Sequence, residues 1–363
     1  MTAREGDSEA TSRREPPVRR ATLKDVAERA GVDKSTASRV LRGVGPLTVR
    51  EDTRARVFKA AEDLRYKPNQ IAQSLRSSRT RSLGIVVPQV INPVYAQIIV
   101  GASNTTRERD YMLLISQTGD SVDTMIYDQL VNQNRVDGLL VATLRDEAAQ
   151  LAALKALGVP FVLVNRQGDD TTNYVMCDEV EGAYQATKHL IERSHRRIAH
   201  LAGEQNRFNA KMRLAGYRRA LEEAGIPFDP ALVAVSGYDQ RGGEGAMQQI
   251  LSTVTPLPTA VFVVTLVAAA GAMATVHKAG LAIPQDISFL SFHNGSLADM
   301  LYPPLTTLEV PMEHIAACAT EGLIEILEGR REMIEKTIPA GAVIERQSVA
   351  DLRTGRAKAH RKS

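Results

Sequence analysis

The sequence TLKDVAERAGVDKSTASRVLRG, residues 22–43, sets two short amphipathic segments on either side of a glycine. The first segment begins with the spacing of a helix-capping box, from Thr22 to Asp25, and it ends at Gly31. Asp33 is then the predicted N-cap of a second short helix. Two short helices joined by a turn that contains glycine indicate a helix-turn-helix unit.

A third amphipathic segment follows at residues 48–66, where Thr48 and Glu51 have the spacing of a second capping box. We therefore predict a helix-turn-helix DNA-binding domain over residues 21–67. The preceding residues 1–20 are polar, contain two adjacent prolines and lack hydrophobic periodicity, so we predict a disordered arm there.

The second helix carries the residues expected to read DNA. In a helix-turn-helix, this helix enters the major groove with its N-terminal residues at the base edges. Lys34 and Ser35 occupy that position, and Arg39 lies one turn later on the same face. An arginine can pair bidentately with guanine, which gives about 1–3 kcal/mol of discrimination between bases. Thr36 and Ser38 suit phosphate contacts or packing in the turn. Simple exposure to solvent is the alternative for Lys34 and Ser35.

The charge of the chain is uneven. Residues 1–81 carry 19 Lys and Arg against 11 Asp and Glu, whereas residues 82–350 carry 21 against 30. A basic N-terminal part followed by an acidic body indicates that the N-terminal part alone binds a polyanion. A solvated charged surface is the alternative. Residues 350–363 form a short basic tail.

The segment PNQIAQSLR, residues 68–76, predicts a short helix after Pro68 that exposes Leu75. An apolar side chain in a basic segment can wedge between base steps in the minor groove and bend the duplex. We therefore predict a hinge helix and linker over residues 68–81.

From residue 82 to residue 349, short strand patterns alternate with amphipathic helical patterns. This alternation predicts a parallel sheet with helices on both faces, and the length indicates two such sheets, hence a two-lobed α/β domain. No dinucleotide-binding GxGxxG or phosphate-binding GxxxxGK(S/T) motif occurs. The strand candidates are LGIVVP, YMLLISQ, DGLLVA, FVLVNR, IAHLAG, LVAVSGY, AVFVVT and ISFLSF, which start at residues 83, 111, 137, 161, 198, 232, 260 and 287.

In two-lobed α/β proteins, ligands bind in the crevice beyond the carboxyl ends of the strands. The polar residues at the ends of the strand candidates, or in the segments that follow them, are therefore the candidate ligand contacts. They are Asn92, Tyr95, Asn165, Arg166, Tyr238, Thr265, His293 and Asn294.

The chain resembles the lactose-repressor (LacI/GalR) family from about Thr22 to Val349. The segments that carry the resemblance are TLKDVAERAGVDKSTASRVLRG, YKPNQIAQSLRSSRTRSLGIVVP, NPVYAQII, RVDGLLVA, EGAYQATKHLIERSHRRIAHLAG and YPPLTTLEVP. The resemblance implies a homodimer on pseudopalindromic operator DNA, with each body resembling a periplasmic sugar-binding protein. It also implies that Leu75 is a minor-groove lever and that Tyr66 and Asn69 contact the DNA backbone. The predicted DNA-contacting residues are Thr22, Lys34, Ser35, Thr36, Ser38, Arg39, Tyr66, Asn69 and Leu75.

The resemblance also implies an effector pocket in the crevice, with Arg213 at the family's arginine position. Family members usually carry Asn-Asp where this chain has Thr265-Leu266, and usually Asp where it has His293. Without those carboxylates, Arg166, Arg213 and His293 would leave the pocket rich in donors and positive charge. The predicted effector contacts are Tyr95, Asn165, Arg166, Arg213, Tyr238, Thr265 and His293.

Some gluconate repressors of the family also carry Phe-His at this point, as this chain does at residues 292–293. We therefore expect a sugar acid such as gluconate, or another small carboxylate, as the effector; a packing role is the alternative for His293. The tail lacks the heptad helix that makes the lactose repressor tetrameric, which favours a dimer. Ligand-driven closure of the lobes is expected to change the spacing of the paired heads, and the family contains both release and recruitment of DNA.

Two other classes of function compete with a ligand-responsive repressor. A solute-binding protein of a transport system is disfavoured by the basic beginning and by an N-terminus without an apolar signal region. An α/β enzyme that uses the crevice has no nucleotide, metal or nucleophile motif to support it: His189, His195 and His200 lack metal-ligand spacing, and no GxSxG occurs. We expect no cofactor.

The distant Cys177 and Cys318 match no metal spacing and indicate a reduced, cytoplasmic compartment. The sequence contains no apolar run of about 18 residues, so we expect no membrane span.

Overall fold

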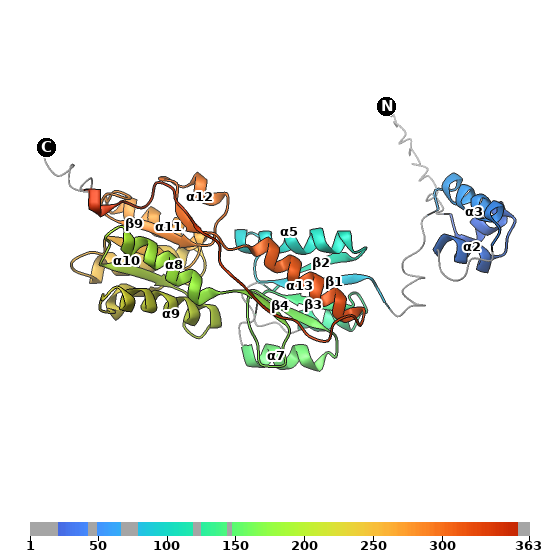
Figure 1. Ribbon diagram of the computed structural model, residues 1–363, viewed down its shortest axis with the longest axis horizontal. Helices are drawn as coiled ribbons and strands as arrows, with labels where there is room; N and C mark the ends of the chain where they lie inside the picture. The colour runs from blue at the N-terminus through green and yellow to red at the C-terminus, as the bar shows by residue number, and fades with distance from the viewer. Residues whose placement is uncertain (1–20, 43–48, 67–78, 119–124, 144–146, 355–363) are drawn as a thin grey trace, which may run out of the picture. The chain divides into compact units, whose positions relative to one another are not determined.

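The computed structural model describes residues 21–42, 49–66, 79–118, 125–143 and 147–354 (Figure 1). The chain divides into two compact units, Met1–Arg79 and Thr80–Ser363.

The first unit packs three helices around a small apolar core. The helices are α1 (Leu23–Ala30), α2 (Lys34–Arg42) and α3 (Glu51–Asp63), and Val26, Ala37, Val40, Val57 and Ala60 are buried between them.

Local sequence signals account for the ends of α1. The Thr22 hydroxyl accepts a hydrogen bond from the backbone of Asp25 at 3.3 Å, and the Asp25 carboxylate accepts one from the backbone of Thr22 at 2.7 Å. Gly31 ends the helix with φ +66°, a left-handed conformation that glycine adopts without strain. The helix α3 begins at Glu51, and its N-cap is Arg50. A helix capped by Thr48, as the sequence predicts, would begin two residues earlier. Residue 48 itself lies outside the described residues.

The second unit contains two six-stranded sheets, one in each lobe. The first-lobe sheet has the order β11-β5-β4-β3-β1-β2, and neighbouring strands are parallel. Its strands are β1 (Ser82–Val87), β2 (Met112–Gln117), β3 (Gly138–Val141), β4 (Phe161–Val164), β5 (Tyr174–Cys177) and β11 (Glu335–Ile338). The helices of this lobe are α5 (Pro93–Glu108), α6 (Met125–Val131), α7 (Glu147–Ala156) and α13 (Met312–Leu327).

The second-lobe sheet has the order β12-β10-β9-β8-β6-β7, in which β10 and β12 pair antiparallel and the other neighbours pair parallel. Its strands are β6 (Ile198–Ala202), β7 (Val233–Val235), β8 (Ala260–Val263), β9 (Ser288–Phe292), β10 (Thr306–Leu308) and β12 (Val343–Ile344). The helices of this lobe are α8 (Glu179–Glu192), α9 (Phe208–Glu223), α10 (Gln240–Thr253), α11 (Leu266–Lys278) and α12 (Leu297–Met300).

This architecture confirms the predicted fold class, an α/β body of two doubly wound sheets after a three-helix head. Each of the eight strand candidates contains a strand. Within the described residues, β5, β10, β11 and β12 were missed by the sequence analysis. They are two to four residues long, which is too short to stand out as strand patterns, and β10 and β11 also contain threonine or charged residues.

The chain crosses between the lobes where β5 leads to α8, where β10 leads to α13 and where β11 leads to β12 (Figure 1). Neighbouring crossings are hydrogen-bonded to each other. Asp178 donates its backbone N–H to the Ile338 carbonyl at 2.9 Å, and the Gly341 backbone donates to the Glu309 carbonyl at 2.8 Å. The lobes are therefore joined by a compact hinge of paired segments.

The helices α5 and α13 lie side by side on the first lobe (Figure 1). They approach so closely that a Cβ on Gly101 would lie 2.2 Å from the backbone oxygen of Glu313. Ile98 and Ile315 of this pair are buried in the core, whereas Val100 is 44% exposed. One face of each amphipathic helix therefore serves the core.

Candidate functional site

The predicted DNA-reading helix begins with a compact capping arrangement. The Asp33 carboxylate accepts the backbone N–H groups of Ser35 and Thr36, each at 2.9 Å, and it also accepts both of their hydroxyls. These bonds hold the pKa of Asp33 well below its usual range, and the bonds from the Ser35 and Thr36 hydroxyls have the largest effect. Asp33 is thus the N-cap that the sequence predicts, and the two hydroxyls help to form the helix start.

The helix presents two cations and a hydroxyl to solvent. Lys34, Ser35 and Arg39 are exposed, and the Arg39 guanidinium lies 3.4 Å from the Ser35 hydroxyl. Thr36 and Ser38 are half-buried. This arrangement presents a cationic face that suits base edges and phosphates.

The remaining predicted DNA contacts fall in different places. Thr22 is exposed, with its hydroxyl in the capping box of α1. Tyr66 is half-buried against the helical core, and burial raises the pKa of its phenol. Asn69 and Leu75 lie outside the described residues, as does the predicted hinge helix around them.

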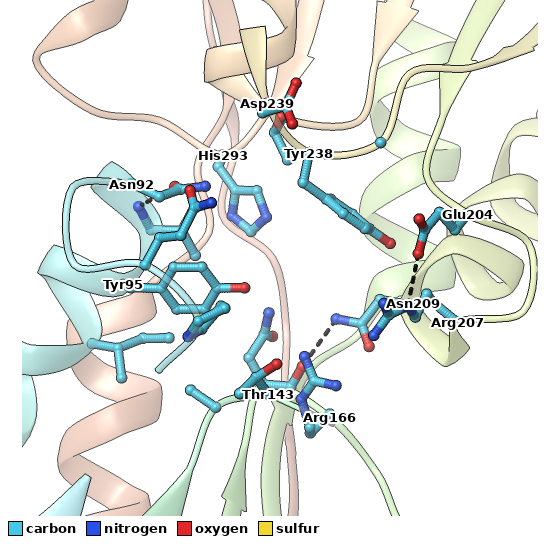
Figure 2. Close-up of a pocket in the computed structure, with 18 of the residues that line it drawn as sticks. Asn92, Tyr95, Thr143, Arg166, Glu204, Arg207, Asn209, Tyr238, Asp239 and His293 are labelled. Atoms are coloured by element: carbon cyan, nitrogen blue, oxygen red, sulfur yellow. Dashed lines mark hydrogen bonds and ion pairs between the residues drawn. The ribbon is translucent and has the colours of Figure 1, made fainter. Parts of the chain in front are cut away.

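A cavity of about 380 Å³ lies between the two lobes of the body, beyond the carboxyl ends of the strands. Figure 2 shows its aromatic and polar side chains facing the space from both lobes. The seven predicted effector contacts all line this cavity. From the first lobe come Asn92, Tyr95, Thr143, Asn165 and Arg166, and from the second lobe come Glu204, Arg207, Asn209, Arg213, Tyr238, Asp239, Thr265 and His293.

Asn294 does not line the cavity and belongs instead to the hinge. Its amide donates to the Glu309 carboxylate at 2.8 Å, and its side-chain oxygen accepts from Arg346 at 3.0 Å. Its backbone carbonyl accepts from Gln97 of the first lobe at 3.1 Å. The residue that follows His293 therefore ties the cavity wall to the junction of the lobes.

Arg213 is paired with a carboxylate of the protein itself. Its guanidinium donates twice to Glu179, and both side chains are almost completely buried. It also donates to the Val264 carbonyl at 2.8 Å and lies 4.0 Å from the centre of the Phe292 ring. Burial opposes the charge of Arg213, but the adjacent Glu179 raises the pKa, so the guanidinium stays charged.

His293 is neutral in this environment. Burial and the neighbouring Arg213 hold the pKa of the imidazole well below its usual value. Its Nε2 lies 3.1 Å from the guanidinium of Arg213. The backbone of His293 has φ +71°, an uncommon conformation for a residue with a Cβ, of the kind found at functional sites.

The expectation of a strongly cationic pocket therefore needs correction. Glu179 balances the charge of Arg213, His293 carries none, and Arg207 is paired with Glu204 at 3.0 Å. Arg166, which belongs to the first lobe, is the other cationic side chain of the three that the sequence analysis placed in the cavity wall. The reason is tertiary: Glu179 lies 34 positions before Arg213 and reaches it only through the packing of α8 on α9.

Asn165 connects the first lobe to the second. It has φ +57° directly after β4, and its side-chain oxygen accepts the backbone N–H of Cys177 at 3.3 Å. Its own carbonyl accepts from the amide of Asn209 at 2.9 Å, and the same amide donates to Glu179 at 2.8 Å. The cavity floor is thus held by a hydrogen-bond chain that runs from one lobe into the other.

Tyr238 and Thr265 are positioned by their neighbours. A Cβ on Gly203 would lie 2.4 Å from the Tyr238 hydroxyl, so glycine is needed there for the ring to occupy its place. Thr265 is the N-cap of α11 and accepts the backbone N–H of Ala268 at 3.2 Å. The Thr265 hydroxyl can still donate to a ligand.

Sequence reasoning missed Glu179, Asn209, Thr143, Glu204, Arg207 and Asp239. Asn209 could have been found, because it lies one turn before Arg213 on the same helix. Glu179 follows β5, a strand that was not recognised. Within the described chain, no group of three or more His, Cys, Asp or Glu could hold a metal ion.

Comparisons with known proteins identify the family. Residues 22–69 match the model of bacterial regulatory proteins of the lacI family, and residues 80–345 match that of periplasmic binding proteins and the sugar-binding domain of the LacI family. The chain belongs to the LacI family. The family assignment made from the sequence is thereby confirmed.

Curated relatives include the HTH-type transcriptional repressor PurR of Erwinia tasmaniensis, 34% identical over 91% of this chain and 97% of that protein. The PurR of Aliivibrio fischeri is 34% identical over 85% of this chain and 93% of that protein. These relatives are transcriptional repressors, so this LacI-family chain is a DNA-binding transcriptional repressor and not an enzyme.

Solved structures agree on the fold. The transcriptional regulator CelR in complex with cellobiose has a TM-score of 0.68 and 29% identity, covering 91% of this chain and 100% of that chain. The lac repressor dimer bound to operator and the anti-inducer ONPF has a TM-score of 0.79 and 24% identity, covering 92% and 100%. In the part of the chain that is described, no helix has the length and apolar character to cross a membrane.

Proposed function

We propose that a small effector, held in the cavity between the lobes, switches the affinity of this LacI-family repressor for its operator. The observation that carries this proposal is the cavity itself, which is lined from both lobes and bounded by the hinge. A ligand that contacts Asn165 in one lobe and His293 in the other stabilises one relative position of the lobes.

We propose a small polar molecule rich in hydrogen-bond acceptors as the effector, with a sugar acid as the favoured class. Arg166 offers a cationic donor, and the Tyr95 and Tyr238 side chains offer hydroxyls and flat apolar rings (Figure 2). A carboxylate at Arg166 would form a charge-assisted hydrogen bond. The cavity volume of about 380 Å³ suits a ligand of this size.

A flat nitrogen heterocycle with carbonyl groups is the second candidate. Tyr95, Phe208 and Tyr238 contribute three aromatic rings to the wall, and such rings stack on planar ligands. Ring nitrogens and carbonyl oxygens of such a molecule accept hydrogen bonds, as the oxygens of a sugar acid do.

Thermal unfolding with matched ligands separates these classes. Gluconate, glucose and a purine base are each added to the purified protein. A ligand at a hundred times its dissociation constant adds about 2.7 kcal/mol to the free energy of unfolding. A shift with gluconate and not with glucose supports the sugar-acid class, a shift with the purine base alone supports the heterocycle, and a shift with glucose alone contradicts both.

We also propose that the repressor acts as a homodimer on pseudopalindromic DNA in the cytoplasm. Three apolar side chains of the first lobe, Val100 on α5 and Met112 and Ile115 on the edge strand β2, are 44%, 59% and 52% exposed. An edge strand with exposed apolar residues is a natural site for a second copy. Sedimentation should give a dimer, and Ile115→Lys should give monomers.

For DNA, we propose that Lys34, Ser35 and Arg39 read bases and that Thr36 and Ser38 contact phosphates. Their placement at the start of α2, together with the family, supports these roles. Thr22, Tyr66 and Asn69 are proposed as further contacts on the resemblance alone, and Leu75 on the resemblance together with its apolar side chain in a basic segment.

A further inference from the structure

The imidazole of His293 has one ring nitrogen whose role the protein leaves open. Nδ1 is buried and has no hydrogen-bond partner among the described residues, while the residue lines the effector cavity. His293 is 3% exposed. A buried polar atom without a partner costs free energy, so such an atom in a cavity wall points to a ligand that satisfies it.

Arg213 decides what this nitrogen can offer. Its guanidinium has only donors, and it faces Nε2 of His293 at 3.1 Å. Nε2 must therefore accept, which leaves the single proton of the neutral ring on Nδ1. The free nitrogen in the cavity wall is then a donor.

Arg213 itself is fixed from several sides. Glu179 takes two of its donors, the Val264 carbonyl takes another, and the Phe292 ring lies against its plane. Glu179 is in turn held by the amide of Asn209 at 2.8 Å. The guanidinium therefore has its charge balanced inside the protein, and its orientation toward His293 does not depend on a ligand.

With the cavity holding the effector as proposed above, we propose that Glu179 and Arg213 hold His293 as a neutral donor at Nδ1, against which the effector places a hydrogen-bond acceptor. The acceptor is a carboxylate, carbonyl or hydroxyl oxygen, or an unprotonated ring nitrogen. An ammonium group does not fit at this point because it offers only donors. Glu179 and Arg213 are positioning residues that act through His293.

The test is ¹⁵N NMR of the ligand-free protein labelled at its histidines, with the His293 signals assigned by their loss in His293→Gln. Protonated and unprotonated ring nitrogens give clearly different ¹⁵N signals, so the spectrum shows directly which nitrogen carries the proton. The expected result for the wild-type protein near pH 7 is a protonated Nδ1 and an unprotonated Nε2. A proton on Nε2, or a doubly protonated ring, overturns the proposal.

Glu179→Gln tests the origin of this state at nearly constant volume. Loss of the carboxylate charge should release Arg213 from its fixed orientation, so that the two nitrogens of His293 exchange their protonation and their signals move toward each other. Glu181→Gln is the matched control, because Glu181 lies on the same helix but pairs with Arg219 at the surface. His293 signals that stay unchanged in Glu179→Gln contradict the proposal, and the wild-type spectrum decides it if that variant does not fold.

Calorimetric titration with gluconate tests the ligand side. His293→Glu offers acceptors only and should weaken gluconate binding by about 10–100-fold, whereas His293→Gln keeps a donor and should lose less than about tenfold. Equal losses in the two variants contradict the donor role. If gluconate does not bind the wild-type protein, the sugar-acid part of the proposed function fails, while the NMR result still decides the state of His293.

Discussion

Asn209 on α9 of the second lobe donates a hydrogen bond of 2.9 Å to the backbone carbonyl of Asn165 at the end of β4 in the first lobe. This bond closes the floor of the cavity and joins the lobes away from the hinge. The same amide holds Glu179, which lies just after the first crossing between the lobes. Lobe position and cavity shape are therefore linked through one side chain.

Asn209→Ala should loosen the lobes. The change removes hydrogen bonds to Asn165 and Glu179, and it should lower the free energy of unfolding by about 1–3 kcal/mol, because buried acceptors lose their partner. Urea denaturation measures this loss. Asn104→Ala on the exposed face of α5 is the control and should change stability little; an equally stable Asn209→Ala would show that the inter-lobe bond contributes nothing.

Glu179→Ala should be strongly destabilising. It leaves the charge of Arg213 buried without a counter-ion, which costs about 3–5 kcal/mol. Glu181→Ala, which breaks a half-exposed pair with Arg219, should cost only about 0–1 kcal/mol. The double variant Glu179→Met/Arg213→Met should recover most of the lost stability; a double variant as unstable as Glu179→Ala would mean that the buried charge is not the cause.

His200 should make the protein sensitive to acid. Burial lowers the pKa of this histidine to about 4, below the ordinary value of 6.5, and its ring stacks between Tyr217 and Phe262. Between pH 6.5 and pH 4 the unfolded chain takes up the proton and the folded chain does not. Stability is therefore full above pH 6.5 and falls as the pH drops, by up to about 3 kcal/mol.

His200→Phe should flatten this dependence, because phenylalanine keeps the stacking and does not titrate. Denaturation at pH 7 and pH 5 measures the difference for the wild type and the variant. The exposed His277→Gln serves as the control. An unchanged slope in His200→Phe would assign the acid sensitivity to other groups, such as His189, whose pKa burial also lowers to about 4.

Arg39→Ala should relax DNA specificity at one base pair. A bidentate contact with guanine contributes about 1–3 kcal/mol to discrimination, so selection from random DNA should lose one conserved position in each half-site. Lys59→Ala, which removes an exposed charge on α3, is the control for non-specific attraction. Equal weakening on all sequences would instead make Arg39 a phosphate contact.

The sequence predicted those features that depend on local or periodic signals. Asp33 was recognisable as a helix cap from its neighbours, and Asn165, Tyr238 and His293 were placed in the crevice because parallel strands end at the same edge of a sheet. These residues need no knowledge of their spatial partners to be found.

The charge state of the cavity could not be predicted in this way. Glu179 follows a strand of only four residues, and its partner Arg213 lies on another helix. His293 is neutral because of burial and of the orientation of Arg213, and both arise only when the second lobe is folded. A list of charged residues near the crevice therefore overstates its positive charge.

The most direct test of the central claim is the affinity of the repressor for a selected operator, measured by fluorescence anisotropy at fixed salt with and without gluconate. Thermal unfolding on the same sample establishes whether gluconate is bound. The account predicts that bound gluconate changes the operator dissociation constant by about 5–150-fold, the usual range for coupled sites. Gluconate that raises the melting temperature and leaves the operator affinity unchanged would contradict it.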